Sequence, residues 1–253
     1  MQNLLLLGGT LEARRIAADL AGDDGFAATL SLAGVTSSPP DPGIPMRTGG
    51  FGGVDGLAEY LKSHAIDVLV DATHPYASRM SANAVEACNR TGIRRLTLWR
   101  PAWQASGSDD WREFPDWPTL IDALPDGARV FLAAGQDGMI AFSAPEKSSA
   151  PEKAGSRRID LVARALSRPD GTPENLRFIQ SLPGKTWQDE AGLFTRERIS
   201  HIVAKNSGGT ASTAKLAAAR ELGLPVLMLA RPDAPEPPLY DDEESLLSAL
   251  RGG

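Results

Sequence analysis

The sequence predicts an α/β protein of two similar domains, each with a mainly parallel sheet flanked by helices. Short runs of apolar strand formers alternate with helical patterns along most of the 253 residues. Three of these runs are followed at once by a polar or glycine-rich segment that opens the next helical pattern: Gly8–Arg14, Asp71–Tyr76 and Lys205–Gly209. Loops in this position, after strands of an open parallel sheet, are where such proteins bind their ligands.

The composition is that of a globular protein with a core. Hydrophobic residues make up 42% of the chain, and no apolar run approaches the roughly 20 residues of a membrane span. Leu4–Leu7 follows the N-terminus without the basic start of a secretory signal, so we expect a cytoplasmic protein that binds no membrane. The net charge of −6 disfavours nucleic acid as a partner, because nucleic-acid binding normally rests on a basic face.

Neither a disulfide nor a metal site is expected. Cys88 is the single cysteine and lies in a helical pattern, where a small buried thiol is the common arrangement. The three histidines, His64, His74 and His201, are far apart in the sequence and form no metal-ligand motif.

The first half of the chain has the pattern of a βαβ series. Leu4–Leu7 is an apolar strand, and apolar residues from Leu11 to Leu20 mark an amphipathic helix after it. A long stretch rich in Pro, Gly and Ser, Gly34–Gly53, is too flexible for an ordinary turn, and loops of this length are usually functional. The other elements expected here are strands at Ala27–Ala33, Asp67–Val70 and Arg95–Trp99 and helices at about Val54–His64 and Tyr76–Arg90.

A second series follows a crossing segment. Composition shifts at Trp99–Trp103, and periodicity stops until about Asp110. The elements expected after it are helices at about Pro118–Leu124, Gln188–Arg198 and Thr210–Leu222 and strands at Val130–Ala134, His201–Ala204 and Val226–Leu229. We therefore predict two Rossmann-like domains, residues 1–102 and 103–253, with the ligands in the cleft between them.

A repeated segment lies within the second half. Ala144–Lys147 recurs as Ala150–Lys153 in a stretch with almost no large apolar residue, which predicts a surface loop over about residues 143–158. A tolerated insertion and a lid that orders over a ligand are both consistent with this composition.

Gly8-Gly9-Thr10 ends the first strand and opens the first helix. Free backbone N–H groups and the positive end of the helix would face an incoming phosphate there. The full Gly-x-Gly-x-x-Gly fingerprint is absent, so a tight turn without a ligand is the alternative. Glu12 and Arg14, in the first turn, fit either exposed charges or contacts with the cofactor or the helix end.

The second strand carries no acidic residue at its end. An Asp or Glu there commonly binds the ribose hydroxyls of NAD and would repel the additional phosphate of NADP. The residues present, Ala33–Ser38, are small and partly hydroxyl-bearing, which favours NADPH over NADH. A polar loop without ligand contacts is the alternative.

Thr73 and His74 follow a strand that ends at Val70, so they are expected at the carboxyl edge of the sheet. This position favours ligand contact for His74 over a capping or packing role. Pro75 is expected to start the next helix, and Tyr76 fits either the core or a wall of the site.

Lys205–Gly209 repeats the strand, loop and helix arrangement in the second half. Lys205 offers a positive charge, Asn206 and Ser207 offer hydrogen bonds, and the glycines make room for an anion or a large flat ligand. The spacing is not that of a triphosphate-binding loop. An N-capped helix with an exposed lysine is the alternative.

Several arginines lie at loop or strand ends, where a planar guanidinium suits carboxylates. A single arginine is most often a surface charge, but several in an acidic protein favour a ligand with several carboxylates. These are Arg79, Arg100, Arg164, Arg168 and Arg231.

Six segments in a fixed order carry a resemblance to a known family: Gly8–Arg14, Gly49–Gly53, Asp71–Ala77, Arg100–Trp103, Lys205–Gly209 and Ala218–Pro232. With them, nearly the whole chain resembles the precorrin-6A reductase family of cobalamin biosynthesis. The resemblance implies hydride transfer from a reduced nicotinamide to a double bond of the corrin precursor, with protonation of the adjacent carbon. Because the acid that binds the ribose is missing after the second strand, we expect NADPH rather than NADH and the cobalt-free precursor. No catalytic side chain or proton donor is identified.

The resemblance also implies which residues bind the two ligands. The coenzyme would be held in the first domain by Gly8, Gly9, Thr10, Ala33, Gly34, Thr73 and His74. The substrate, a tetrapyrrole with several carboxylates, would be bound by Arg79, Arg164, Arg168, Lys205, Asn206, Ser207, Gly208 and Arg231, mainly in the second domain. Hand-over of the product to the next enzyme of the pathway is left open.

Two alternatives stay open beside this hypothesis. One is an NADH-dependent cobalt-precorrin-6A reductase of the anaerobic branch, and the other is a dinucleotide-binding regulator without catalysis. A short-chain dehydrogenase or sugar epimerase is disfavoured, because its Tyr and Lys lie four residues apart. Here Tyr76 is followed at that distance by Met80, and Tyr60 by His64.

Overall fold

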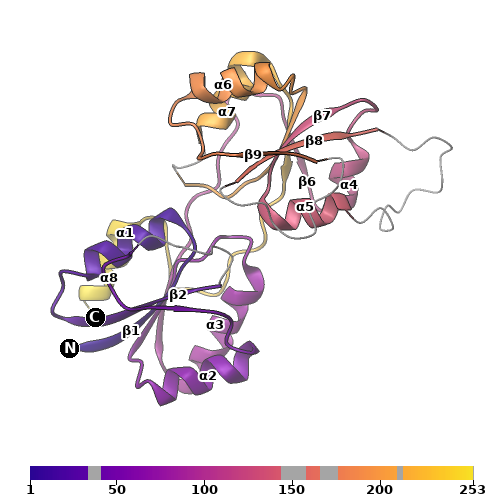
Figure 1. The fold of residues 1–253 in the computed structure, drawn as a ribbon. Helices are drawn as coiled ribbons and strands as arrows, with labels where there is room; N and C mark the ends of the chain where they lie inside the picture. Colours follow the sequence, from indigo (N-terminus) through magenta and orange to yellow (C-terminus); the bar gives the residue numbers. More distant parts are fainter. Residues whose placement is uncertain (34–40, 144–157, 166–175, 210–212, 253) are drawn as a thin grey trace. The chain divides into compact units, whose positions relative to one another are not determined.

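The computed structural model describes residues 1–33, 41–143, 158–165, 176–209 and 213–252. The chain divides into two compact units (Figure 1). Unit 1 comprises Met1–Pro101 and Pro232–Gly253, and unit 2 comprises Ala102–Arg231. Among the described residues, each unit contains a six-stranded sheet in which all paired strands are parallel. The predicted fold class, two Rossmann-like domains with parallel sheets flanked by helices, is confirmed.

The sheet of unit 1 has the strand order β12-β5-β4-β1-β2-β3. The order reverses at β1, which pairs with β2 on one side and β4 on the other. Its strands are β1 (Gln2–Leu7), β2 (Phe26–Leu32), β3 (Met46–Thr48), β4 (Val68–Asp71), β5 (Arg94–Leu98) and β12 (Leu239–Tyr240). Its helices are α1 (Leu11–Leu20), α2 (Gly53–Ser63), α3 (Ser78–Thr91) and α8 (Glu243–Arg251). In such sheets the ligand crevice lies beyond the carboxyl ends of the strands at the reversal point.

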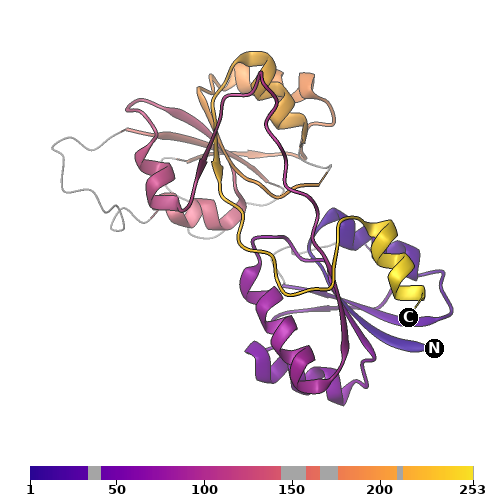
Figure 2. The same ribbon diagram turned by 180° about the vertical axis from the view of Figure 1, so that it is seen from behind.

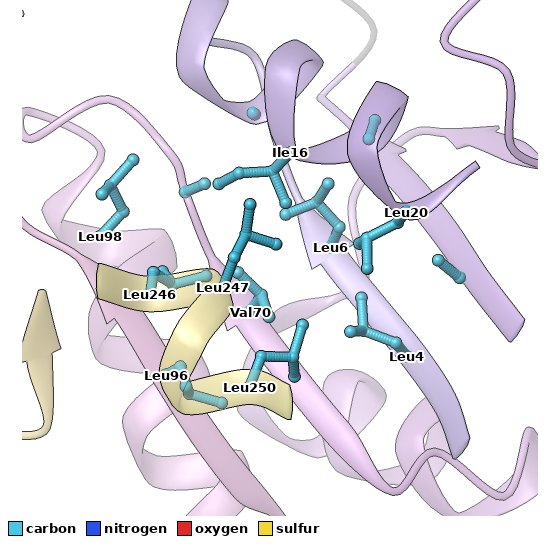
Figure 3. Packing of buried hydrophobic residues seen from close by; sticks show 14 of the residues in the cluster. Leu4, Leu6, Ile16, Leu20, Val70, Leu96, Leu98, Leu246, Leu247 and Leu250 are labelled. Atoms are coloured by element: carbon cyan, nitrogen blue, oxygen red, sulfur yellow. The ribbon is translucent and has the colours of Figure 1, made fainter. Parts of the chain in front are cut away.

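Both faces of this sheet are buried, which is why the last four residues of β1, Leu4–Leu7, are all leucine. Successive side chains of a strand point to opposite faces. Leu4 and Leu6 therefore pack with leucines and isoleucine of α1 and α8, and this cluster is shown in Figure 3. Leu5 and Leu7 pack on the opposite face with apolar residues of α2 and α3.

Unit 2 repeats the same plan. Its strand order is β6-β11-β10-β7-β8-β9, and it reverses at β7, between β8 and β10. Its strands are β6 (Trp111–Phe114), β7 (Arg129–Ala133), β8 (Asp160–Ala165), β9 (Leu176–Gln180), β10 (His201–Lys205) and β11 (Val226–Leu229). Its helices are α4 (Trp117–Asp122), α5 (Gly135–Ser143), α6 (Trp187–Arg196) and α7 (Thr213–Leu222).

The predicted boundary of the second domain is wrong at its C-terminal end. Residues 232–253, expected in the domain 103–253, belong to unit 1. There β12 pairs with β5, and Arg95 donates from Nη2 to the carbonyl oxygens of Glu236 and Pro237 at 2.8 and 3.1 Å. Figure 2 shows the yellow segment returning to the unit that holds the N-terminus. The edge position beyond β11 in unit 2 is filled instead by β6, which follows the crossing segment.

Other differences have local causes. The stretch predicted as a loop, Gly34–Gly53, contains β3 because Met46–Thr48 pairs with the end of β2. The helix expected to start at Pro75 starts at Ser78, since a turn closed by the hydrogen bond from Ala77 N to His74 O (2.7 Å) precedes it. Seven of the described elements were not predicted: β3, β6, α5, β8, β9, β12 and α8. The repeat at Ala144–Lys153 lies outside the described residues.

The structure can be compared with two further expectations, a buried thiol at Cys88 and the lack of a membrane-spanning segment. Cys88 is buried in α3, and burial raises the pKa of its thiol to about 11, which keeps it protonated and unreactive. No helix in the described part of the chain has the length and apolar character needed to cross a membrane.

The packing of α8 predicts that the C-terminal segment stabilises unit 1. Leu246 is fully buried against the sheet, so Leu246→Ala should lower the free energy of unfolding by about 2–5 kcal/mol through lost contacts and a cavity. Urea denaturation followed by circular dichroism measures this effect. Ser248→Ala, an exposed change in the same helix, should stay within about 0.5 kcal/mol of the wild type. Equal stability of the two variants would contradict the packing role of α8.

Candidate functional site

The loop between β1 and α1 allows a ligand to approach the backbone closely. A Cβ on Gly8 would lie 2.6 Å from Leu30 Cδ1 and 3.3 Å from Ala13 Cβ, so a side chain at this position would have to displace the buried side chain of Leu30. Gly9 has φ +120°, a conformation that strongly favours glycine, and no atom would meet a Cβ there within 4 Å. The space above Gly9 and the N-terminus of α1 are suited to an anionic group such as a phosphate.

Thr10 joins this loop to the end of β4. Its hydroxyl accepts a hydrogen bond from Ala13 N (3.1 Å), which caps α1, and donates one to the carbonyl oxygen of Ala72 (2.8 Å). The side chain is buried and both bonds are internal to the protein. Thr10 therefore acts on a ligand by fixing the loop, and its backbone rather than its hydroxyl faces the site.

The segment after β4 is held by the buried carboxylate of Asp71. Asp71 Oδ1 accepts hydrogen bonds from Thr73 N (3.0 Å) and Thr73 Oγ1 (2.7 Å). His74 is half-buried, and its Nδ1 accepts from Tyr76 N at 3.3 Å. In the neutral imidazole this leaves the proton on Nε2. Thr73 and His74 thus lie at the reversal point of the sheet, beside the Gly8–Thr10 loop, as the sequence predicted.

Glu12 and Arg100 form a buried ion pair within unit 1. Arg100 Nη1 donates to Glu12 Oε2, and the two side chains are 9% and 7% exposed. Glu12 lies in the first turn of α1, where a carboxylate is stabilised by the helix dipole. Glu12 is therefore not an exposed charge, and its ion pair with Arg100 is a contact that the sequence did not predict.

The other described candidates in unit 1, Ala33 and Arg79, are at exposed positions. Ala33, directly after β2, is exposed, and Arg79 is an exposed residue in the first turn of α3. Arg79 is therefore in the same unit as the coenzyme candidates and not in unit 2. Gly34 lies outside the described residues.

In unit 2 two of the predicted cations, Lys205 and Arg164, are already paired with carboxylates. Lys205, at the end of β10, donates from Nζ to Asp137 Oδ2 in α5 at 2.5 Å. Arg164, near the end of β8, donates from Nη2 to Glu190 Oε1 at 2.6 Å, and both side chains of this pair are largely buried. Because neighbouring carboxylates offset their charges, these cations present a polar rather than a strongly positive edge.

Asn206 fixes the crossing segment to the glycine loop. Its Oδ1 accepts from Trp103 N (2.8 Å) and its Nδ2 donates to Trp103 O (3.1 Å). The indole Nε1 of Trp103 donates to Gly209 O at 2.9 Å, which orients the ring beside the loop. The side-chain amide of Asn206 is thus engaged within the protein, and Ser207 is the half-buried hydroxyl of the loop.

Arg164 and the Lys205–Gly208 loop gather at one edge of the second sheet, because they follow the carboxyl ends of β8 and β10. Arg231 comes two residues after the end of β11, at the same edge, and its side chain is half-buried. Arg168 lies outside the described residues. In each unit the described candidates at or just beyond the strand ends thus share one edge of the sheet, whereas Arg79 lies in α3.

Sequence reasoning missed two charged residues at this edge. Glu190 is 1% exposed, and its Oε1 accepts hydrogen bonds from Arg164 Nη2 and from the backbone N–H of Gly184 (2.5 Å). Lys215 lies in the first turns of α7, with Nζ 5.3 Å from the centroid of the Trp103 ring. Burial, partly offset by Glu190, lowers the pKa of Lys215 from its ordinary value of 10.5 to about 8. Both residues look like ordinary helix-surface charges in the sequence, so no local pattern marks them.

No group of three or more histidine, cysteine or acidic side chains in the described ranges could hold a metal ion.

The chain is similar to proteins of known activity over almost its whole length. The family model described as precorrin-6x reductase CbiJ/CobK matches residues 3–251. A precorrin-6A reductase of Rhodobacter capsulatus is 44% identical over 239 residues, which cover 93% of this chain and 90% of that protein. A precorrin-6A reductase of Rhodococcus erythropolis is 39% identical, with 99% and 96% of the two chains covered.

A solved structure agrees with these matches. The structure titled CobK precorrin-6A reductase has a TM-score of 0.88 and 40% identity to this chain, and the match covers 100% of this chain and 97% of that one. A cobalt-precorrin-6A reductase of Priestia megaterium is less similar, at 28% identity, with 98% of this chain and 97% of that protein covered.

The surroundings of Lys215 predict a specific pH dependence of stability. Its pKa is depressed in the folded state, so the folded lysine loses its proton before the unfolded one as pH rises. Between about pH 8 and pH 10.5 the free energy of unfolding should therefore gain a contribution on the order of 1–3 kcal/mol from this residue. Urea denaturation of wild type and Lys215→Met at several pH values measures the difference. A parallel pH dependence of the two proteins would show that Lys215 titrates normally.

Proposed function

The chain belongs to the precorrin-6x reductase CbiJ/CobK family, and from this premise we propose that it reduces precorrin-6A to precorrin-6B with NADPH. It is an oxidoreductase of cobalamin biosynthesis, its coenzyme is a reduced nicotinamide dinucleotide, and its substrate is a tetrapyrrole precorrin. The higher identity to precorrin-6A reductases than to the cobalt-precorrin enzyme favours the cobalt-free substrate. We place the reaction in the cytoplasm, where reduced nicotinamide coenzymes are regenerated.

The geometry that carries the proposal is the reversal point of the first sheet. A side chain on Gly8 would clash with the side chain of Leu30, Gly9 adopts a positive φ, and the N-terminus of α1 follows at once. This arrangement fits the pyrophosphate of a dinucleotide, which needs backbone N–H donors and close approach. Unit 1 is therefore proposed as the coenzyme-binding unit, through Gly8, Gly9, Thr10, Ala33, Gly34, Thr73 and His74.

The preference for NADPH rests on the end of β2. The last residues of the strand are Ser31 and Leu32, and exposed Ala33 follows, so no carboxylate stands where NAD enzymes bind the ribose hydroxyls. An additional phosphate on the ribose would meet no acidic repulsion from these residues.

Unit 2 is proposed to bind the carboxylates of the precorrin. Arg164, Lys205, Ser207, Gly208 and Arg231 lie at or just beyond the carboxyl ends of its strands, and Arg168, Asn206 and Arg79 complete the proposed substrate set. A carboxylate of the substrate can compete with Asp137 for Lys205, because Asp137 is largely exposed while the lysine is 11% exposed. The ammonium group would then exchange an internal partner for a substrate partner.

The reduced nicotinamide supplies the hydride when it is bound, and the residues of this chain orient the reactants and limit access of water. Thr10 and Asp71 help to orient the reactants because their hydrogen bonds fix the loop after β1 and the loop after β4. His74 stands at the same edge with its Nδ1 occupied by the Tyr76 N–H, which keeps the ring in one orientation. No side chain is assigned as the proton donor.

The experiment that tests the function follows oxidation of NADPH and of NADH at 340 nm under anaerobic conditions, with precorrin-6A or its cobalt form added. Loss of the NADPH signal that depends on precorrin-6A is the expected result. Oxidation only with the cobalt form would assign the enzyme to the cobalt branch instead. Coenzyme binding without turnover of either substrate would favour a regulator and overturn the proposal.

Lys205→Ala should weaken binding of precorrin-6A by about 1.5–3 kcal/mol and leave NADPH binding nearly unchanged, because a charge-assisted hydrogen bond to the substrate is lost. Titration of each ligand under anaerobic conditions gives the two dissociation constants. Lys185→Ala is the matched control, since Lys185 is an exposed lysine of the same unit. If the two variants bind precorrin-6A equally well, Lys205 is not a substrate residue.

A further inference from the structure

The function assigned above leaves the segment Arg47–Gly53 without a role, although its sequence is unusual. Arg47 is in the short edge strand β3, and the four residues Gly49–Gly52 connect this strand to α2, which begins at Gly53. Gly49, Gly52 and Gly53 all have positive φ angles, so the chain follows a path that other residues rarely adopt. The segment is thus a defined structure and not simply a flexible connection.

Four contacts hold the guanidinium of Arg47 in one place. Nη1 donates to Ser31 Oγ in β2 at 2.6 Å, and Nη2 donates to Gly50 O at 3.2 Å. The guanidinium carbon lies 4.0 Å from the centroid of the Phe51 ring and 5.2 Å from that of Tyr60.

The aromatic support of Arg47 is itself fixed. The rings of Phe51 and Tyr60 meet edge to face at 5.1 Å. A Cβ on Gly56 would lie 1.7 Å from Phe51 O, so the loop packs directly onto the backbone of α2 at that residue. Arg47 is therefore pre-oriented by groups that do not depend on a ligand.

The partners of Arg47 are uncharged. A hydroxyl, a carbonyl and two aromatic rings surround it, and in the described part of the chain no carboxylate comes within 4.0 Å of its nitrogens to form an ion pair. The side chain is half-buried. A half-buried cation without a counter-ion attracts an anion more strongly than one that is already paired.

Arg47 is also connected to the coenzyme edge. Ser31, which accepts its hydrogen bond, accepts another at its carbonyl oxygen from Gly8 N (2.9 Å) in the proposed phosphate loop. Gly49 N donates to Leu32 O at 2.9 Å, which places the glycine segment against the end of β2. In sheets of this strand order the adenosine half of a dinucleotide lies beyond the end of β2, where an arginine can accommodate the 2′-phosphate of NADP.

We propose that Arg47 is the residue that selects NADPH over NADH, by binding the 2′-phosphate of the adenosine ribose. This inference rests on the proposed function and assigns its coenzyme preference to one side chain. The planar guanidinium is suited to a phosphate because it offers several donors in a fixed geometry. Ser31 and Phe51 are positioning residues for Arg47, since they hold it at the end of β2.

The test compares ligands that differ only in the 2′-phosphate. Dissociation constants for NADPH and NADH, and for 2′,5′-ADP and 5′-AMP, are measured by calorimetry with wild type, Arg47→Gln and Arg47→Lys. Arg47→Gln should weaken NADPH and 2′,5′-ADP by about 10- to 100-fold and change NADH and 5′-AMP by less than about threefold. Arg47→Lys keeps a charge without the fork and should give an intermediate loss.

Arg15→Gln is the matched control, because it removes an exposed arginine of the same unit whose partner is a surface carboxylate. It should bind all four ligands as the wild type does. Thermal unfolding of each variant identifies any general loss of structure, which would weaken both members of a ligand pair alike.

Equal weakening of the phosphorylated and unphosphorylated ligands by Arg47→Gln would mean that Arg47 only supports the loop, and it would overturn the inference. An unchanged affinity for NADPH would overturn it as well. Both results would leave the reductase function intact, because that function is decided separately by oxidation of coenzyme with precorrin-6A. Wild-type protein that binds NADPH and NADH equally would overturn both this inference and the proposed NADPH preference.

Discussion

The hydroxyl of Thr10 is the contact on which the ligand edge of the first sheet depends. It caps α1 and bonds to the backbone just after β4, so one side chain sets the distance between the two loops at the reversal point. Asp71 holds the second loop from the other side through Thr73. Because both groups bond only to protein, the backbone donors of the first loop stay oriented before any ligand arrives, and little ordering is needed on binding.

The two units present different chemical groups at the carboxyl edges of their sheets. The edge of unit 1 offers backbone groups and glycines, as suits a phosphate that is bound by N–H donors. The edge of unit 2 offers charged side chains in internal pairs, Arg164 with Glu190 and Lys205 with Asp137. Such pairs lower the cost of holding cations at a partly buried edge while the substrate is absent. The same sheet plan thus carries two kinds of recognition.

Much of the fold and part of the candidate site could be predicted from local patterns. The apolar runs at Leu4–Leu7 and His201–Ala204 and the glycines after them are signals within a few residues, and the structure has strands and loops there. The two-residue strand β12 has no periodicity, and its partner β5 lies far earlier in the chain, so its place could not be predicted. Ion-pair partners such as Glu190 depend on packing in space, so a local pattern does not reveal them. The long flexible loop expected over Gly34–Gly53 contains a paired strand at Arg47.

The return of the C-terminal segment to unit 1 has a consequence for synthesis on the ribosome. Residues 102–231 are continuous, so unit 2 can form as soon as they have emerged. Unit 1 begins before unit 2, yet its sheet lacks β12 and its core lacks the leucines of α8 until residues 239–251 have emerged. Domains generally fold as they leave the ribosome, N-terminal first. Here unit 1 is completed only after unit 2, and until then the edge of β5 and the part of the sheet face that α8 covers stay open for a chaperone to bind.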